Sequence, residues 1–356
     1  MMPVIAAFGG VVAPALIFTA INHGSAAASG WGIPTATDIA FAVGILSILG
    51  DRVPVSLKVF LTALAIADDL IAILVVALFY GGTINFGLLS IAFVLIALVL
   101  LMNKLGEKRG WFYLVPAIAI WSLFYYAGIH STMSGVVMAF LVPMTPRFNE
   151  AYFHRKRLQY IRRLNEYNGI ASTSSEFPNG PQRHCLRRLS AISRDSIGMS
   201  YRLEHALGPW VNFLIMPIFA LANAGVEIPD VSYFNVFQFD QVLGSVSMGI
   251  FLGLVLGKPL GISLASFIAV KLHVGEMPAK STWPMLIAVA CLGGIGFTMS
   301  IFVDTLSFGD QTPEVMARLR DMGKVAVLMG SLCAGILGSV LINIIHGIES
   351  RKAVKA

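Results

Sequence analysis

The sequence predicts an all-α integral membrane protein, and its composition and its long apolar segments are the observations that predict it. Of the 356 residues, 56% are hydrophobic and only 12% are charged, and the mean hydropathy is +0.78. These values exclude an ordinary soluble domain. A helix that spans a bilayer needs about 20 mostly apolar residues. About ten segments qualify as transmembrane helices: 3–21, 34–50, 55–80, 84–102, 111–127, 129–143, 207–226, 242–270, 284–303 and 323–346.

The first of these segments begins almost immediately after Met1 and Met2. It has neither a flanking basic region nor a small-residue cleavage site, so it does not read as a signal peptide. A membrane protein that starts inside a helix leads us to expect that an upstream portion is missing.

The second and ninth segments carry interruptions that a helix facing lipid would not tolerate. Pro34 precedes the polar residues Thr37 and Asp38 in the second segment. The ninth contains the run CLGGIGFTMS, with Gly293, Gly294, Gly296 and Thr298. Unwound backbone at membrane depth persists only where protein or a water-filled cavity satisfies it, and such a pair of interrupted spans indicates a binding site in a transporter. Kinks or close helix contacts are the alternative.

The third segment contains two adjacent aspartates, Asp68 and Asp69. A carboxylate in the middle of a membrane costs roughly 2.5 to 3.5 kcal/mol on insertion scales, so two of them normally line a path for ions or protons. Successive residues of a helix point about 100° apart, so the two carboxylates cannot project to the same spot. We expect Asp69 to face an ion cavity and Asp68 to turn toward a basic partner.

Lys258 is the candidate for that partner, because it is the basic residue that lies deepest inside an apolar segment. A lysine there needs an anionic partner or the carbonyl end of a helix. Asp38 is its complement, since an acid at the break of a helix can lie against the positive ends of half-helix dipoles.

The distribution of Lys and Arg predicts the orientation. With ten alternating spans, most basic residues fall on one side, which is therefore cytoplasmic, together with both termini. The expected division of the chain is a six-helix N-terminal membrane portion, a basic cytoplasmic loop, a four-helix C-terminal membrane portion and a cytoplasmic tail, at residues 1–143, 144–206, 207–346 and 347–356.

The loop between residues 146 and 205 carries eleven Lys or Arg against five Asp or Glu. Contact with lipid headgroups is compatible with this charge, whereas we expect no nucleic-acid partner. Its middle, ASTSSEFPNGPQ, reads as a flexible linker. The three cysteines have no paired spacing and read as packing residues.

Several long runs of the sequence resemble the NhaA-type sodium/proton antiporters of bacterial inner membranes, over nearly the whole chain and in the right order. They are GWGIPTATDIAFAVGILSILGDRVPVSLKVFLTALAIADDLIAILVVALFY, GIHSTMSGVVMAFLVP, RLEHALGPWVNFLIMPIFALANAGV, LGKPLGISL and GGIGFTMSIFV. The resemblance implies an inverted-repeat transporter in which two discontinuous helices cross at the midplane, and this family is itself a known example of that fold.

The resemblance also implies roles for individual residues. Asp69 matches the principal cation-binding and proton-carrying carboxylate, Asp68 its participating neighbour, and Lys258 the lysine that compensates their charge. The unwound stretches of the two broken helices match Thr37 with Asp38 and Gly293 to Thr298. The positions associated with pH response match His130, Glu204 and His205.

The expected function is therefore antiport of sodium, and of lithium, against external protons, with no enzymatic activity and no cofactor. A hard monovalent cation prefers oxygen ligands, here Asp68, Asp69 and Thr37 or unwound carbonyls. Protons compete for the same oxygens, so the Asp68 and Asp69 pair should titrate as a coupled unit.

Two departures from the family leave alternatives open. The family normally carries two further helices before the point where this chain starts, including a hairpin that forms much of its homodimer contact, so a homodimer is expected to be weakened. The polar segment 147–200 is also longer than usual. The alternatives are a truncated, non-transporting antiporter fragment and, more remotely, an intramembrane aspartyl protease.

Overall fold

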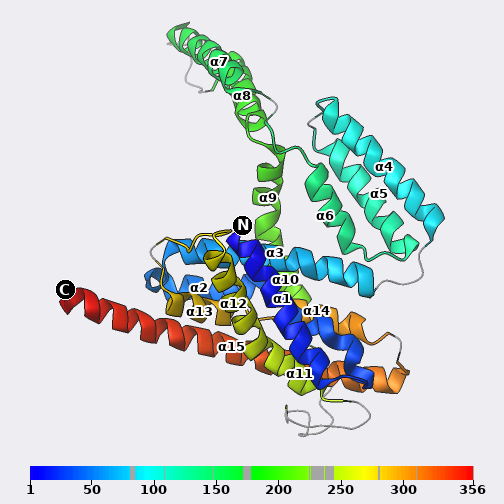
Figure 1. The fold of residues 1–356 in the computed structure, drawn as a ribbon. Coiled ribbons are helices and arrows are strands. Elements are labelled where there is room, and N and C mark those ends of the chain that lie inside the picture. The colour runs from blue at the N-terminus through cyan, green and yellow to red at the C-terminus, as the bar shows by residue number, and fades with distance from the viewer. Residues whose placement is uncertain are drawn as a thin grey trace. The chain divides into compact units, whose positions relative to one another are not determined.

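The protein is helical throughout most of the part that the computed structural model describes (Figure 1). That part comprises residues 1–80, 85–107, 109–146, 148–170, 178–223, 225, 236, 244–279, 281–309 and 311–355. The chain divides into two compact units, one made of Met1–Gly81 with Ile215–Ala356 and the other of Gly82–Leu214. We call them the discontinuous unit and the central unit.

The discontinuous unit contains both interrupted spans. Its helices are α1 (Met2–Ile21), η1 (Ala26–Thr35), α2 (Ile39–Leu49), η2 (Gly50–Arg52), α3 (Val55–Phe79), α10 (Met216–Asn223), α11 (Val246–Leu252), the π-helical turn η5 (Gly253–Gly257), α12 (Lys258–Lys271), α13 (Trp283–Leu292), α14 (Phe297–Ser307) and α15 (Pro313–Lys355). The helices of the central unit are α4 (Phe86–Lys104), α5 (Trp111–Ala127), α6 (Thr132–Leu141), α7 (Glu150–Ile170), α8 (Gly180–Asp195) and α9 (Met199–Trp210), which continues into the π-helical turn η3 (Val211–Ile215).

The helices confirm the predicted membrane fold. Among the described residues, six helices are long and apolar enough to cross a bilayer, or eight if each of two bent pairs forms one span. The bent pairs are η1 with α2, at 41°, and α13 with α14, at 52°. The shorter apolar helices α5 and α6 occupy the two remaining segments that the sequence marks as apolar.

Large apolar side chains on the outer faces of these helices are consistent with a bilayer around them. In α4, for example, Phe93 is 60% exposed and Val94 is 71% exposed. The opposite face of the same helix packs against α5, where Ala92 and Val99 are fully buried. An apolar surface of this extent is rare on soluble monomers.

Two segments differ from what the sequence indicates. The last span is not limited to 323–346, because α15 continues from Pro313 to Lys355 as one helix of 43 residues. At 1.5 Å per residue it is about 65 Å long. It contains no proline beyond its first position, so nothing ends it where the apolar run ends.

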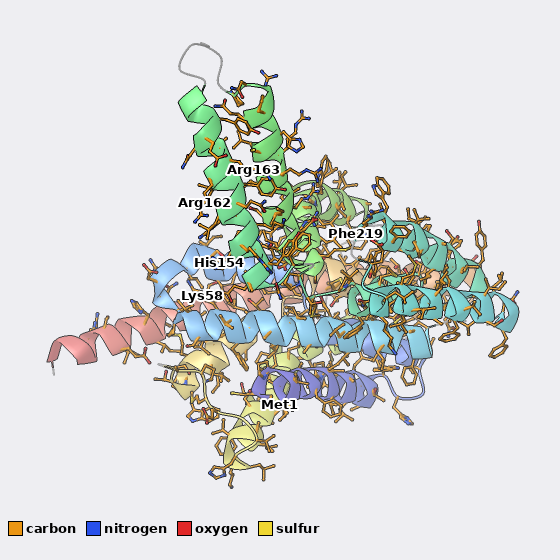
Figure 2. The ribbon with its side chains drawn as sticks, turned by 90° about the horizontal axis from the view of Figure 1, so that it is seen from above. Met1, Lys58, His154, Arg162, Arg163 and Phe219 are labelled. Atoms are coloured by element: carbon orange, nitrogen blue, oxygen red, sulfur yellow. The ribbon has the colours of Figure 1, made fainter. Side chains whose placement is uncertain are left out.

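The basic loop between residues 146 and 205 is largely helical in the part that the structure describes. Helices α7 and α8 pack against each other, and α7 carries the basic side chains of Arg162 and Arg163 (Figure 2). At the start of α8, the Asn179 side chain accepts from the backbone N–H of Gln182 at 3.0 Å while the Gln182 side chain accepts from Asn179 at 2.8 Å. This capping box begins a helix in the second half of the expected linker; residues 171–177 lie outside the described residues.

Glycines at every fourth position bring α1 close to the helix that carries Lys258. Gly253, Gly257 and Gly261 lie on one face of the α11–η5–α12 span, and a Cβ on Gly261 would come within 2.1 Å of the Gly9 carbonyl oxygen in α1. Small residues spaced in this way let membrane helices approach backbone to backbone. Helices α1 and α12 consequently lie side by side (Figure 1).

Candidate functional site

The two helix breaks of the discontinuous unit touch each other through hydrogen bonds. The backbone N–H of Asp38 donates to the carbonyl of Ile295 at 2.7 Å, and the Thr37 hydroxyl donates to the carbonyl of Gly293 at 2.8 Å. Unwound backbone groups of one span thus satisfy those of the other, which membrane interiors require. The two interrupted spans therefore cross at their breaks.

Asp38 lies at the N-termini of two half-helices. Its Oδ1 accepts from the backbone N–H of Phe41, in the first turn of α2, at 3.2 Å. Its Oδ2 accepts from the backbone N–H of Thr298 at 3.1 Å and from the Thr298 hydroxyl, at the start of α14. The side chain is buried. A carboxylate in this position caps free N–H groups and offsets the positive ends of two helix dipoles.

Lys258 supplies the opposite charge at the same crossing. Its buried ammonium donates to the Thr37 hydroxyl at 2.5 Å and to Oδ2 of Asp68. Thr37 in turn donates to Gly293, which is the C-cap of α13. The cation is therefore connected through one hydroxyl to the negative end of a half-helix, where positive charge is favoured.

Asp68 and Asp69 are adjacent on α3 but have different surroundings. Asp68 is completely buried and forms an ion pair with Lys258. Asp69 is partly exposed, and its buried Oδ1 has no hydrogen-bond partner among the described residues. Oδ1 of Asp68 also lacks one there. Carboxylate oxygens that are buried and unsatisfied are costly unless a proton or a cation binds them.

The backbone before Lys258 departs from a regular α-helix. The π-helical turn Gly253–Gly257 ends directly before Lys258, and Pro259 follows it. Such π-turns occur frequently at functional sites because they re-aim the side chains that follow. Here the turn precedes the lysine whose side chain joins α3 and the first helix break.

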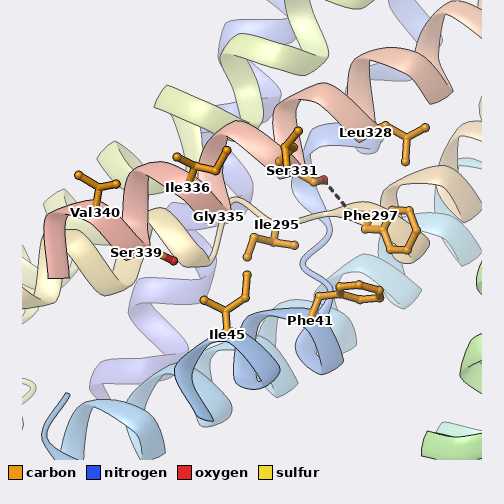
Figure 3. A pocket seen from close by; sticks show the side chains of 11 residues that line it. Phe41, Ile45, Ile295, Phe297, Leu328, Ser331, Gly335, Ile336, Ser339 and Val340 are labelled. Atoms are coloured by element: carbon orange, nitrogen blue, oxygen red, sulfur yellow. Dashed lines mark hydrogen bonds between the residues drawn. The ribbon is translucent and has the colours of Figure 1, made fainter. Parts of the chain in front are cut away.

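Ser331 of α15 completes the crossing and was not singled out from the sequence. Its Oγ accepts from the backbone N–H of Gly296 at 3.2 Å and of Phe297 at 3.0 Å, and the second bond is drawn in Figure 3. It thus satisfies two N–H groups at the start of α14. A serine in an apolar run carries no sequence signal that separates it from an ordinary packing residue.

An apolar cavity of about 620 Å³ lies beside the crossing (Figure 3). Phe41 and Ile45 of α2, Ile295 and Phe297 of the second break, and one face of α15 line it. Its lining side chains supply no carboxylate, so this cavity differs chemically from the cluster around Asp69.

The three residues expected to respond to pH belong to the central unit, whereas the Asp68, Asp69 and Lys258 cluster belongs to the discontinuous unit. His130 is half-buried before α6, and its Nδ1 lies 2.9 Å from the Thr132 hydroxyl. Glu204 and His205 are exposed on α9.

These features define a multi-pass membrane protein with a buried charged cluster where two interrupted spans cross. A sequence model of the family described as Na+/H+ antiporter 1 matches residues 1–342. Relatives named Na(+)/H(+) antiporter NhaA include proteins of Syntrophobacter fumaroxidans, Oleidesulfovibrio alaskensis and Acidithiobacillus ferrooxidans. The first is 40% identical over 95% of this chain and 69% of its own length, the second 40% over 99% and 75%, and the third 42% over 95% and 74%. The chain belongs to the Na+/H+ antiporter 1 family, whose members are transporters and not enzymes.

Proposed function

We propose that this protein exchanges sodium ions for protons across the bacterial inner membrane. The observation that carries the proposal is the unsatisfied carboxylate of Asp69 beside the Asp68 to Lys258 ion pair. The names of the relatives and the crossing of the two interrupted spans support it.

In this mechanism Asp69 binds either a sodium ion or a proton. Its Oδ1 has no competing hydrogen bond within the described part of the chain, and carboxylate oxygens suit a hard cation. Asp68 contributes charge and an oxygen while Lys258 holds it. Because the two aspartates are adjacent, they titrate as a coupled pair. Sodium displaces protons on one side of the membrane, and protons displace sodium on the other.

In this mechanism the conformational change takes place where the two interrupted spans cross. Asp38 and Lys258 place opposite charges against opposite helix ends, so both half-helix junctions are stabilised without regular helical hydrogen bonds. A junction of this kind can tilt without breaking a continuous helix. Exposing one site alternately to each side yields exchange rather than a leak.

The experiment that tests this function measures sodium-driven proton movement in everted membrane vesicles that contain the full 356-residue chain. We expect sodium to release protons in the wild type and not in Asp69→Asn. The matched control is Asp51→Asn, which removes an exposed carboxylate from η2 and should leave exchange intact. Equal activity in Asp69→Asn and wild type would contradict the proposed site.

The vesicle assay separates the fragment from a working antiporter, and a peptide-cleavage assay separates the protease. A truncated, non-transporting fragment would give no sodium response at any pH although the protein is present in the membrane. An intramembrane aspartyl protease would cleave a transmembrane peptide and lose that cleavage in Asp69→Asn. The comparisons support neither alternative.

We further propose that both termini lie on the cytoplasmic side, because that side then receives most Lys and Arg. Cysteine labelling at Ala356 from inside and outside intact cells would test the orientation. The homodimer implied by the resemblance stays a prediction, and chemical cross-linking of the protein in native membranes would test it.

A further inference from the structure

A further buried acid lies in the membrane region outside the cluster described above. Asp304 is in α14, the half-helix that begins at the crossing, and its side chain is 0% exposed. The expected ninth span, 284–303, ends one residue before it, whereas the helix continues to Ser307. Nothing in the proposed exchange at Asp69 uses this carboxyl group.

The surroundings of Asp304 do not satisfy a charged carboxylate. Neither oxygen has a hydrogen-bond partner within the described residues. Gly323 of α15 packs directly against it, since a Cβ on Gly323 would come within 2.1 Å of Oδ1. Burying a charged carboxylate without a hydrogen bond or an ion pair is strongly unfavourable, and binding a proton removes the charge.

The charged groups that face Asp304 come from α15, and they are Arg320, Asp321 and Lys324. Arg320 donates to the carbonyl of Thr305, the residue after Asp304, and its buried Nε has no hydrogen-bond partner among the described residues. Lys324 donates to the Gly225 carbonyl at 2.8 Å. Neither forms an ion pair with Asp304 in the described part of the chain. Helices η1 and α10, which also pack against α14, carry no titratable side chain.

Asp304 lies on a polar face that leads away from the crossing. Ser300, Asp304 and Ser307 are all buried and are spaced by four and three residues, which places them on one side of α14. At one end Ser300 donates to the Ala36 carbonyl of the first helix break at 3.5 Å. At the other end the Ser307 hydroxyl donates to the carbonyl of Val303 within α14 at 2.7 Å.

A proton suits this place better than a metal cation. A sodium ion needs several oxygen ligands, but the nearby Thr305 carbonyl accepts from Arg320 and the Ser307 hydroxyl donates to the carbonyl of Val303 at 2.7 Å. A proton needs only one carboxylate oxygen. On binding, it forms an O–H bond and removes the negative charge, and no other bond breaks.

We propose that Asp304 is a second proton-binding carboxyl group, separate from the Asp68 and Asp69 pair, that takes up and releases a proton along the polar face of α14. The proton comes from the aqueous phase and returns to it. This binding does not require sodium exchange at Asp69, so it can be measured in a chain that does not transport.

Infrared spectroscopy tests the proposal, because a protonated carboxyl group has a C=O stretching band that the ionised form lacks. The sample is the purified full chain carrying Asp68→Asn and Asp69→Asn, titrated from acidic to alkaline pH. We expect a protonated-carboxyl band that disappears when Asp304→Asn is added. The matched control, Asp51→Asn, which removes an exposed carboxylate from η2, should leave that band and its pH dependence unchanged.

Three results would overturn the proposal. One is a band that survives Asp304→Asn, and another is the absence of such a band at every pH. The third is loss of the Asp304 band on adding sodium at constant pH, which would make this a cation site. If Asp304→Asn does not fold, Asp304→Leu removes the same carboxyl group and its charge and decides in the same way.

Discussion

The carboxylate of Asp38 and the backbone N–H of Thr298 are joined across 260 residues of sequence by a hydrogen bond of 3.1 Å. The same carboxylate caps α2 through Phe41. One side chain therefore fixes where two interrupted spans meet, and the neighbouring residue Thr37 connects that meeting point to Lys258. The stability of the crossing and the charge at the site consequently depend on each other.

Replacing only one partner of the ion pair between Lys258 and Asp68 should lower the stability of the folded protein. Lys258→Met leaves a buried Asp68 without its cation, and the expected loss of stability is about 3–5 kcal/mol. Adding Asp68→Asn removes the uncompensated charge and should restore most of it. Thermal unfolding of the purified variants measures both effects. A double variant no more stable than Lys258→Met would show that charge compensation is not the main role of the pair.

Thr37 should tolerate serine but not valine. Its hydroxyl both accepts from Lys258 and donates to Gly293. Thr37→Val leaves a buried donor and acceptor unsatisfied, at a cost of about 1–3 kcal/mol, whereas Thr37→Ser keeps both bonds. The melting temperatures of the two variants check this expectation. Equal melting temperatures would contradict the connecting role of the hydroxyl.

Asp38→Asn should weaken the crossing without abolishing it. The amide oxygen can still accept one N–H, but the negative charge between two helix N-termini is lost. The expected loss is up to about 2 kcal/mol in this buried setting. The control is Asp51→Asn, which removes an exposed carboxylate from η2. Hydrogen exchange at the Thr298 amide gives a local readout, and unchanged protection there would contradict the prediction.

Ser331→Ala should loosen the start of α14. It removes the acceptor for the N–H groups of Gly296 and Phe297, and unsatisfied buried donors cost about 1–3 kcal/mol. The matched control is Ser339→Ala. Ser339 lies further toward the C-terminus of the same helix and also lines the apolar cavity. Faster hydrogen exchange at Phe297 is expected only in Ser331→Ala.

Much of the candidate site could be predicted from single residues. Asp68, Asp69 and Lys258 are conspicuous because each is a charge inside an apolar segment, and the bilayer penalises such charges wherever the rest of the chain goes. The helix breaks at Asp38 and Gly293 are visible for a similar reason, since they place polar or flexible residues within a span.

Other residues could not be recognised in this way. Ser331 is a small polar residue in an apolar helix. Its role is visible only from the backbone N–H groups of Gly296 and Phe297, which donate to it. Asp304 directly follows the apolar run of the ninth segment, so the expected span, 284–303, stops before it. The sequence predicts a basic loop where helices α7 and α8 lie, because its composition is polar, although the capping of α8 and the packing of the two helices against each other make this region helical.

The sequence by itself determined the membrane character and the position of most spans, because burial in a bilayer selects residues one segment at a time. Its motifs determined the family. The tertiary structure alone decided which N–H groups Asp38 and Ser331 satisfy and that the Thr37 hydroxyl joins Lys258 to Gly293. These partners depend on how distant helices pack and in which direction each side chain points. Such packing is a property of the assembled helices and not of any one segment.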